Sequence, residues 1–430
     1  MIITGLHVIL WLLLFNLGIF AMVGVHIGYV KLIILPVIVG ILFVERFINK
    51  PDFKIAYWGY FGFFVVISII SMLRNEIHYA QYASFMVNYW LAYIYFITLS
   101  NENNTSRINV ILRLVKVLVL LQIPAIIIKW SVLGVSEKGG IGTLSVVSGS
   151  LSCIFSLFII IILFSLYLYN RRNIYLWLIP AFILFSIVGE KRATIFFAPL
   201  MLLTVFLIFA FKSKKMQLGQ LLKYVTIGFV ISGITFYATV RMVPSLNPEY
   251  KVGGRFDYTY AKDYIIDYTD LDKDHSRVFY LPVSAMTQIR RLDGFLYFTH
   301  YLWDKGGAAL LFGEGAGKLI LMESVTGEDH SMLSLYGIRY GGRAGFIQAY
   351  LQVGILGVVL LFGMFFHIFK DIWIRFENES MYLALLSVTV LLFLDSFIYS
   401  STFFSDLVVL FMYFGMLALL HGGKRNVYPA

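Results

Sequence analysis

The sequence has little charge and almost no cysteine. Asp, Glu, Lys and Arg make up 13% of its 430 residues, against about 25% in an ordinary soluble domain, whereas hydrophobic residues make up 60%. The single cysteine, Cys153, stands in an apolar run, so one chain cannot build a disulfide framework or a thiolate metal site. These shortages exclude a water-soluble globule and indicate a polytopic membrane protein.

The formal net charge of +10 is the one feature that suggests a nucleic-acid partner. A nucleic-acid site needs basic residues gathered on one soluble face. In this chain the basic excess is spread over short loops between apolar runs. We therefore expect no nucleic-acid partner.

The apolar runs predict an all-α polytopic membrane protein with about 12 transmembrane helices, each of about 20 apolar residues. Internal prolines are tolerated in such helices because neighbouring groups satisfy the freed carbonyls. The predicted runs are 6–24, 28–44, 55–73, 82–99, 108–128, 143–169, 174–188, 194–211, 221–240, 346–369, 381–398 and 402–420.

The basic residues of the short loops predict the orientation, because Lys and Arg are retained on the cytoplasmic side. With both termini in the cytoplasm, the inner loops carry fourteen basic residues and the short outer loops carry five. The five are Arg74, Lys129, Lys138, Lys191 and Arg192. The chain then divides into helices 1 to 9 (1–240), a large external loop (241–345) and helices 10 to 12 (346–430).

The external loop has the charge density of a soluble segment, with twelve basic and thirteen acidic residues. The apolar spacing over 286–303 predicts an amphipathic helix, so the loop is expected to be partly helical. Ten tyrosines in the loop suit either the faces of sugars or the membrane interface. The glycine-rich run 306–319 fails as a nucleotide loop, since Phe312 and Leu319 occupy required positions.

Metal and cofactor chemistry find little support. Asp270, Asp272 and Asp274 alternate like calcium ligands, but His275 and Leu281 stand where that motif needs Gly and Glu. We expect neither a metal nor a cofactor.

Two cations, Lys191 and Arg192, stand in a very short external turn between two apolar runs. Charges at membrane depth are costly and are usually functional or paired. One use for them is to grip the diphosphate of an anionic lipid; the alternatives are an ion pair with Glu190 or extension of the side chains to the interface. Asp395 and Asp406, in the last two runs, are also charges at membrane depth that need either a functional or a structural role. A structural partner is the simpler interpretation for both.

Three stretches resemble the superfamily of bacterial O-antigen and exopolysaccharide polymerases (Wzy-like) and O-antigen ligases. These are GEKRATIFF at 189–197, RRLDGFLYFTHYLWDKGGAALLFGEGAG at 290–317 and GRAGFIQAYLQVGILG at 342–357. Ligases of this superfamily carry a His and, after ten intervening residues, a Gly at the start of the span that follows the loop. Arg343 and Gly354 stand there instead, a pattern associated with polymerases.

The resemblance implies glycosyl transfer from a polyprenyl-pyrophosphate-linked glycan at the outer face of the bacterial inner membrane. In a polymerase the acceptor is another lipid-linked repeat unit, and a chain-length regulator protein is a further partner. An O-antigen ligase acting on lipid A core, a transporter of lipid-linked oligosaccharides and a non-catalytic assembly subunit stay open as alternatives. Membrane lipid surrounds the chain in every case.

Departure of pyrophosphate needs positive charge, and the acceptor hydroxyl needs a base or an orienting group. His330, in the acidic stretch GEDH near the end of the external loop, is the candidate base, because the ordinary pKa of histidine lies near neutrality. The predicted site therefore consists of Arg192, Arg343 and His330 as catalytic residues, with Lys191, Arg290 and Arg291 binding substrate.

Overall fold

Helices are the regular secondary structure of the computed structural model, and no strand occurs among the residues that it describes. Scattered positions between 219 and 238 are described besides the continuous stretches. The stretches are 2–50, 52–133, 142–144, 149–188, 193–213, 240–242, 246–251, 253–261, 291–319, 344–377, 379–399 and 406–421.

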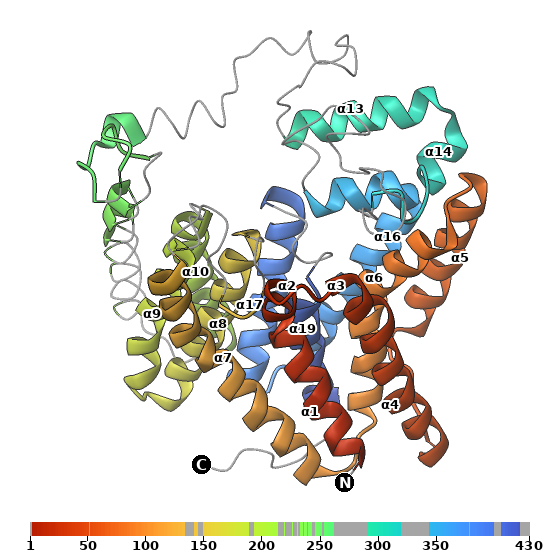
Figure 1. Cartoon of the computed structure of the whole chain (residues 1–430), viewed down its shortest axis with the longest axis horizontal. Helices are drawn as coiled ribbons and strands as arrows, with labels where there is room; N and C mark the ends of the chain where they lie inside the picture. The colour runs from red at the N-terminus through yellow and green to blue at the C-terminus, as the bar shows by residue number, and fades with distance from the viewer. Residues whose placement is uncertain are drawn as a thin grey trace.

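The helices form one bundle, with α13 lying across one of its ends (Figure 1). The first half of the chain contains α1 (Ile2–Phe15), α2 (Leu17–Met22), α3 (Ile27–Tyr29), the π-helix η1 (Val30–Ile34), α4 (Leu35–Asn49), α5 (Trp58–Arg74), α6 (Tyr79–Ser100), α7 (Thr105–Leu133), α8 (Gly149–Asn170), α9 (Ile174–Val188) and α10 (Ala193–Ser213). The second half contains α13 (Arg291–Asp304), α14 (Gly307–Phe312), α16 (Gly345–Ile374), α17 (Ser380–Leu394), the π-helix η5 (Asp395–Tyr399) and α19 (Leu407–His421).

The apolar runs predicted from the sequence fall on these helices, apart from 221–240, most of which lies outside the described residues. In the part of the chain that the structure describes, five helical stretches are long and apolar enough to cross a membrane: Ile27–Asn49, Thr105–Lys129, Leu151–Asn170, Gly345–Ile374 and Ser380–Phe397. Shorter apolar helices accompany them, among them α1, α5 and α19. The chain is therefore a helical membrane protein, as its composition predicts.

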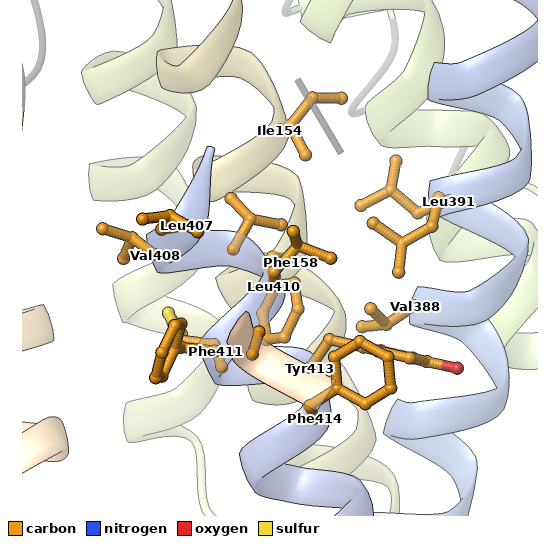
Figure 2. Close-up of a cluster of buried hydrophobic side chains, with 14 of the residues drawn as sticks. Ile154, Phe158, Val388, Leu391, Leu407, Val408, Leu410, Phe411, Tyr413 and Phe414 are labelled. Carbon is orange, nitrogen blue, oxygen red and sulfur yellow. The ribbon is translucent and has the colours of Figure 1, made fainter. Parts of the chain in front are cut away.

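The bundle core is built from helices far apart in sequence. Figure 2 shows Ile154 and Phe158 of α8 facing Val388 and Leu391 of α17, with side chains of α19 beside them. All four residues are fully buried. Cys153, next to Ile154, is also buried, as its apolar surroundings predict.

The loops predicted to be cytoplasmic meet at one end of the bundle, around Glu102. The Glu102 carboxylate forms ion pairs with Arg46 and with Arg107, whose Nη1 lies 2.5 Å from Oε2. Burial alone would raise the pKa of Glu102, but hydrogen bonds from Arg46, the Asn104 amide and Arg107 outweigh it and hold the pKa below its usual value. We name this end of the molecule the Glu102 end.

Contacts between other segments support the same grouping. The Tyr57 hydroxyl lies 3.1 Å from Asp371 Oδ2 and 3.3 Å from His421 Nε2. Lys212 Nζ donates to the Trp373 carbonyl at 2.6 Å. Segments assigned to one side of the membrane by their basic residues thus lie at one end of the structure.

The predicted span 346–369 is interrupted. The helix α16 runs from Gly345 to Ile374, but Gly354 within it has φ 66° and ψ −171°, which is not helical. Figure 1 shows the first part of α16 running below α13 before the helix turns down into the bundle. The change of direction within α16 therefore lies at Gly354.

Candidate functional site

The end of the bundle opposite Glu102 is built by α13, α14 and the first part of α16. We name it the α13 end, and we name residues 313–317 the glycine turn. Phe298 and Leu302 are the buried side chains of α13, whereas Leu296 and Trp303 are 46% and 67% exposed. The predicted amphipathic helix is present from Arg291 to Asp304, and positions 286–290 of the predicted range lie outside the described residues.

The break in α16 receives the glycine turn. Because Gly354 is not helical, carbonyls just before it lose their usual helical donors and need others. The Leu351 carbonyl accepts from the Glu314 amide at 2.7 Å, and the Gln352 carbonyl accepts from Ser71 Oγ at 2.6 Å. Two groups freed by the break are thus satisfied by other segments.

Side-chain amides complete the attachment of the turn. Gln352 Oε1 accepts from the Gly317 amide at 3.1 Å, and its Nε2 donates to the Gln348 carbonyl at 3.2 Å. Asn75, at the end of α5, donates from Nδ2 to the Gly313 carbonyl at 3.3 Å. The glycine turn is therefore hydrogen-bonded to both α16 and α5.

Glycine is required where backbones approach closely with positive φ. A Cβ on Gly313 (φ 77°) would lie 2.6 Å from the Gln352 carbonyl carbon, and one on Gly354 would lie 2.3 Å from the Leu311 carbonyl oxygen. At Gly317 (φ 104°) a Cβ would lie 2.7 Å from the backbone of Gln81. No side chain fits at these three contacts.

Glu314 supplies the charge of the turn. Its carboxylate is 3% exposed and forms ion pairs with Lys305 and with Lys318, whose Nζ lies 2.7 Å from Oε2. Partial burial alone would lower the pKa of Lys305, but hydrogen bonds with Glu314 and Tyr301 outweigh it and raise the pKa. Lys305 is therefore bound to the turn in its charged form.

The starts of α13 and α16 also lie together. The Phe295 ring lies 5.0 Å from that of Phe346 and 5.7 Å from that of Tyr350, between ring centroids. Phe346 also contacts Phe397 of η5 at 5.0 Å. One packed aromatic group therefore holds the starts of α13 and α16 together.

The predicted site residues fall almost entirely outside the described residues. Arg291 is the first residue of α13, but its side chain is not described. Lys191, Arg192, Arg290, His330 and Arg343 lie outside the described residues, as do Asp270, Asp272 and Asp274. The site as predicted from the sequence therefore stays a prediction.

The two acidic residues of the last spans occupy different environments. Asp406 precedes α19, and its Oδ1 accepts from the Val408 amide at 3.1 Å, which is the hydrogen bond of a helix cap. This is the structural role expected for it. Asp395 is fully buried at the first position of η5, and π-helical turns are frequent at functional sites.

Sequence reasoning missed Ser71, Asn75 and Gln352. Each is an ordinary polar residue near the end of an apolar run, and its partner is a backbone group far away in sequence. The one local signal was the pairing of glycines in 313–317 with Gly354, which marks close backbone approach but does not name the partners.

The fold and this end together define a helical membrane protein with an ordered, charged cap on one end of the bundle. Among the described residues, no three His, Cys, Asp or Glu side chains form a group that could hold a metal ion. The chain matches no family model, no curated protein and no solved structure.

Proposed function

We propose that the chain is a polysaccharide polymerase at the outer face of a bacterial inner membrane. It would transfer a glycan from polyprenyl pyrophosphate to a second lipid-linked repeat unit. The observation that carries the proposal is the packing of Phe295 against Phe346, which joins the start of α13 to the start of α16. The arginines of two of the three stretches that resemble the polymerases adjoin this contact in sequence.

In the proposed reaction, an acceptor hydroxyl oxygen attacks the anomeric carbon of the donor glycan. The bond from that carbon to the pyrophosphate oxygen breaks, and the diphosphate leaves on the prenyl lipid. The hydroxyl proton passes to a base, for which His330 is the candidate. Lys191, Arg192, Arg291 and Arg343 would stabilise the leaving diphosphate, with Arg290 as a substitute for Arg291.

The proposal places the α13 end at the outer, periplasmic face of the inner membrane and the Glu102 end in the cytoplasm. This orientation follows from the excess of basic residues in the loops that meet at the Glu102 end. A lipid-linked donor would reach the site from the membrane, with its prenyl tail among the spanning helices.

A transporter is the rival class, and the break in α16 is the feature that favours it, because transporters bind ions at broken helices. The carbonyls of Leu351 and Gln352 beside the break already accept from Glu314 and Ser71. The break therefore serves to attach the glycine turn, which favours the enzyme.

The test is to incubate purified protein with lipid-linked repeat units and to look for a ladder of products. We expect a ladder with the wild type and with Arg172→Ala, a control at the Glu102 end. We expect none with Arg192→Ala or Arg343→Ala. A full ladder from both variants would contradict the proposed clamp, and transfer only to lipid A core would identify a ligase.

The proposed base has its own test. Substituting His330 with Gln removes the titratable group while keeping a polar side chain of similar reach. We expect loss of polymer with normal protein levels in the membrane. Normal polymer from this variant would remove His330 as the base and leave the arginines untouched.

A further inference from the structure

The helix α13 and the first part of α16 are attached to each other at both ends. At their starts, Phe295 packs between Phe346 and Tyr350. At their far ends, the chain that leaves α13 returns through the glycine turn to residues 351–354 of α16. The spacing between the two segments is therefore set by two contacts, one aromatic and one polar.

Gln352 is the centre of the polar contact. It is 4% exposed, and its side-chain oxygen, side-chain amide and backbone carbonyl each form a hydrogen bond, to Gly317, Gln348 and Ser71 respectively. A buried amide can use donor and acceptor together in this way, whereas Leu could use neither and Glu would bring a charge. The contact thus depends on the chemistry of this residue as well as on its size.

We propose that Gln352 is a positioning residue for glycosyl transfer, because it fixes the segment that carries Arg291 against the segment that begins at Arg343. This inference rests on the proposed function. Two cations that hold one diphosphate must keep a fixed separation, and a misplacement of about 1 Å can cost about a hundredfold in rate. The glycine turn is the part of the protein that keeps this separation.

The first experiment measures the separation itself. Cys153 is replaced by Ala, and spin labels are placed on Leu296 of α13 and on Ile355, the exposed position of α16 next to the break that receives the glycine turn. Pulsed electron resonance should give one narrow distance distribution for the otherwise unchanged protein. It should give a broadened or shifted one with Gln352→Leu or with Gly313→Ala.

Each variant has a matched control. Gln348→Leu changes a half-buried glutamine one turn earlier on α16. Gly24→Ala changes a glycine with φ 78°, against 77° at Gly313, but its Cβ would meet nothing within 4 Å. Both controls should keep the narrow distribution. Unchanged distributions with Gln352→Leu and Gly313→Ala would overturn the positioning role.

The second experiment measures polymerisation per folded molecule, in lipid nanodiscs with lipid-linked repeat units. For Gln352→Leu we expect kcat to fall about a hundredfold, with a smaller change in KM, since the prenyl tail and sugars keep their own contacts. A purely structural residue would lower the amount of folded protein and leave kcat unchanged, which would overturn the proposal.

The two experiments separate this inference from the proposed function. If the wild type forms no polymer while the distance still responds to Gln352→Leu, the proposed function fails and the attachment of the turn stands. If the wild type is active and the variant keeps both distance and kcat, the positioning role fails and the proposed function stands.

Discussion

Glu102 shows how a single residue can hold one end of a membrane bundle together. Its carboxylate is 3% exposed, and the side chains of Arg46 and Arg107 that pair with it are 10% and 14% exposed. A buried charge without its partner is costly, because water no longer solvates it. Removing the carboxylate would therefore leave the nearly buried guanidinium groups of Arg46 and Arg107 without their negatively charged partner.

We expect Glu102→Gln to lower the free energy of unfolding by about 3 kcal/mol, the usual cost of breaking a buried ion pair. The measurement is reversible unfolding in detergent. The control is Glu45→Gln, which alters a carboxylate that accepts from Asn49 in an exposed position. Equal stability of the two variants would show that the arginines gain nothing from Glu102.

The same residue predicts a response to acid. The pKa of Glu102 lies below its ordinary value of 4.5 in the folded protein, so the unfolded protein binds more protons in acid. The added stability is complete above about pH 4.5 and is lost as the pH falls through the lowered pKa. We expect the difference in Tm between wild type and Glu102→Gln to shrink between pH 7 and pH 3. A constant difference would contradict the lowered pKa.

The glycine turn is the element whose role depends most on backbone contact. Gly317 in the turn and Gly306 before α14 have nearly equal φ, 104° and 105°, but only Gly317 of the two faces a neighbouring backbone, that of Gln81. The pair therefore separates the strain of a positive φ from the cost of a clash. What Gly317 adds is the contact with α6.

We expect Gly306→Ala to cost about 1–3 kcal/mol of stability, because its φ of 105° and ψ of 159° lie in a region essentially restricted to glycine. Gly317→Ala should cost about 1–3 kcal/mol more, because the turn must move away from α6. Thermal unfolding of the two variants measures the difference. Equal costs would mean that the turn can shift freely over Gln81.

At this scale the sequence predicts the helices well and their interruptions poorly. Hydrophobic runs predict α8 and α17 because their apolar residues extend over whole spans. The break at Gly354 could not be predicted, because a glycine in an apolar helix is tolerated and only a distant partner makes it bend. The same holds for Gln352, whose partner Gly317 lies 35 residues away.

For the molecule as a whole, the grouping of loops was predictable from charge alone. Basic loops assigned together meet around Glu102 and Tyr57, since the positive-inside bias acts on the chain before its helices pack. For the candidate cations, such as Lys191 and Arg192, the sequence shows only that basic residues stand in short external segments between apolar runs. Their geometry depends on segments that the sequence does not define locally.

The orientation of the whole molecule is testable with cysteines, because the only native thiol, Cys153, is fully buried. We expect Tyr79→Cys, at the α13 end and 76% exposed, to react with a membrane-impermeant maleimide in intact cells. Arg172→Cys, at the Glu102 end, should react only after the membrane is opened. The reverse pattern would invert the proposed topology and remove the outer-face enzyme.

The enclosed position of α6 has a consequence for biogenesis. Aromatic rings of α6 contact α19: Tyr95 packs against Phe411, and Phe96 packs against Phe414. The helix α6 contains several tyrosines and is not one of the five stretches apolar enough to cross a membrane. Because α6 ends at Ser100 and α19 begins at Leu407, α6 waits in the membrane without its principal neighbour while the intervening helices are synthesised. We therefore expect stable insertion of α6 to depend on its contacts with other helices of the chain. A chain truncated before residue 407 should be removed by quality-control proteases.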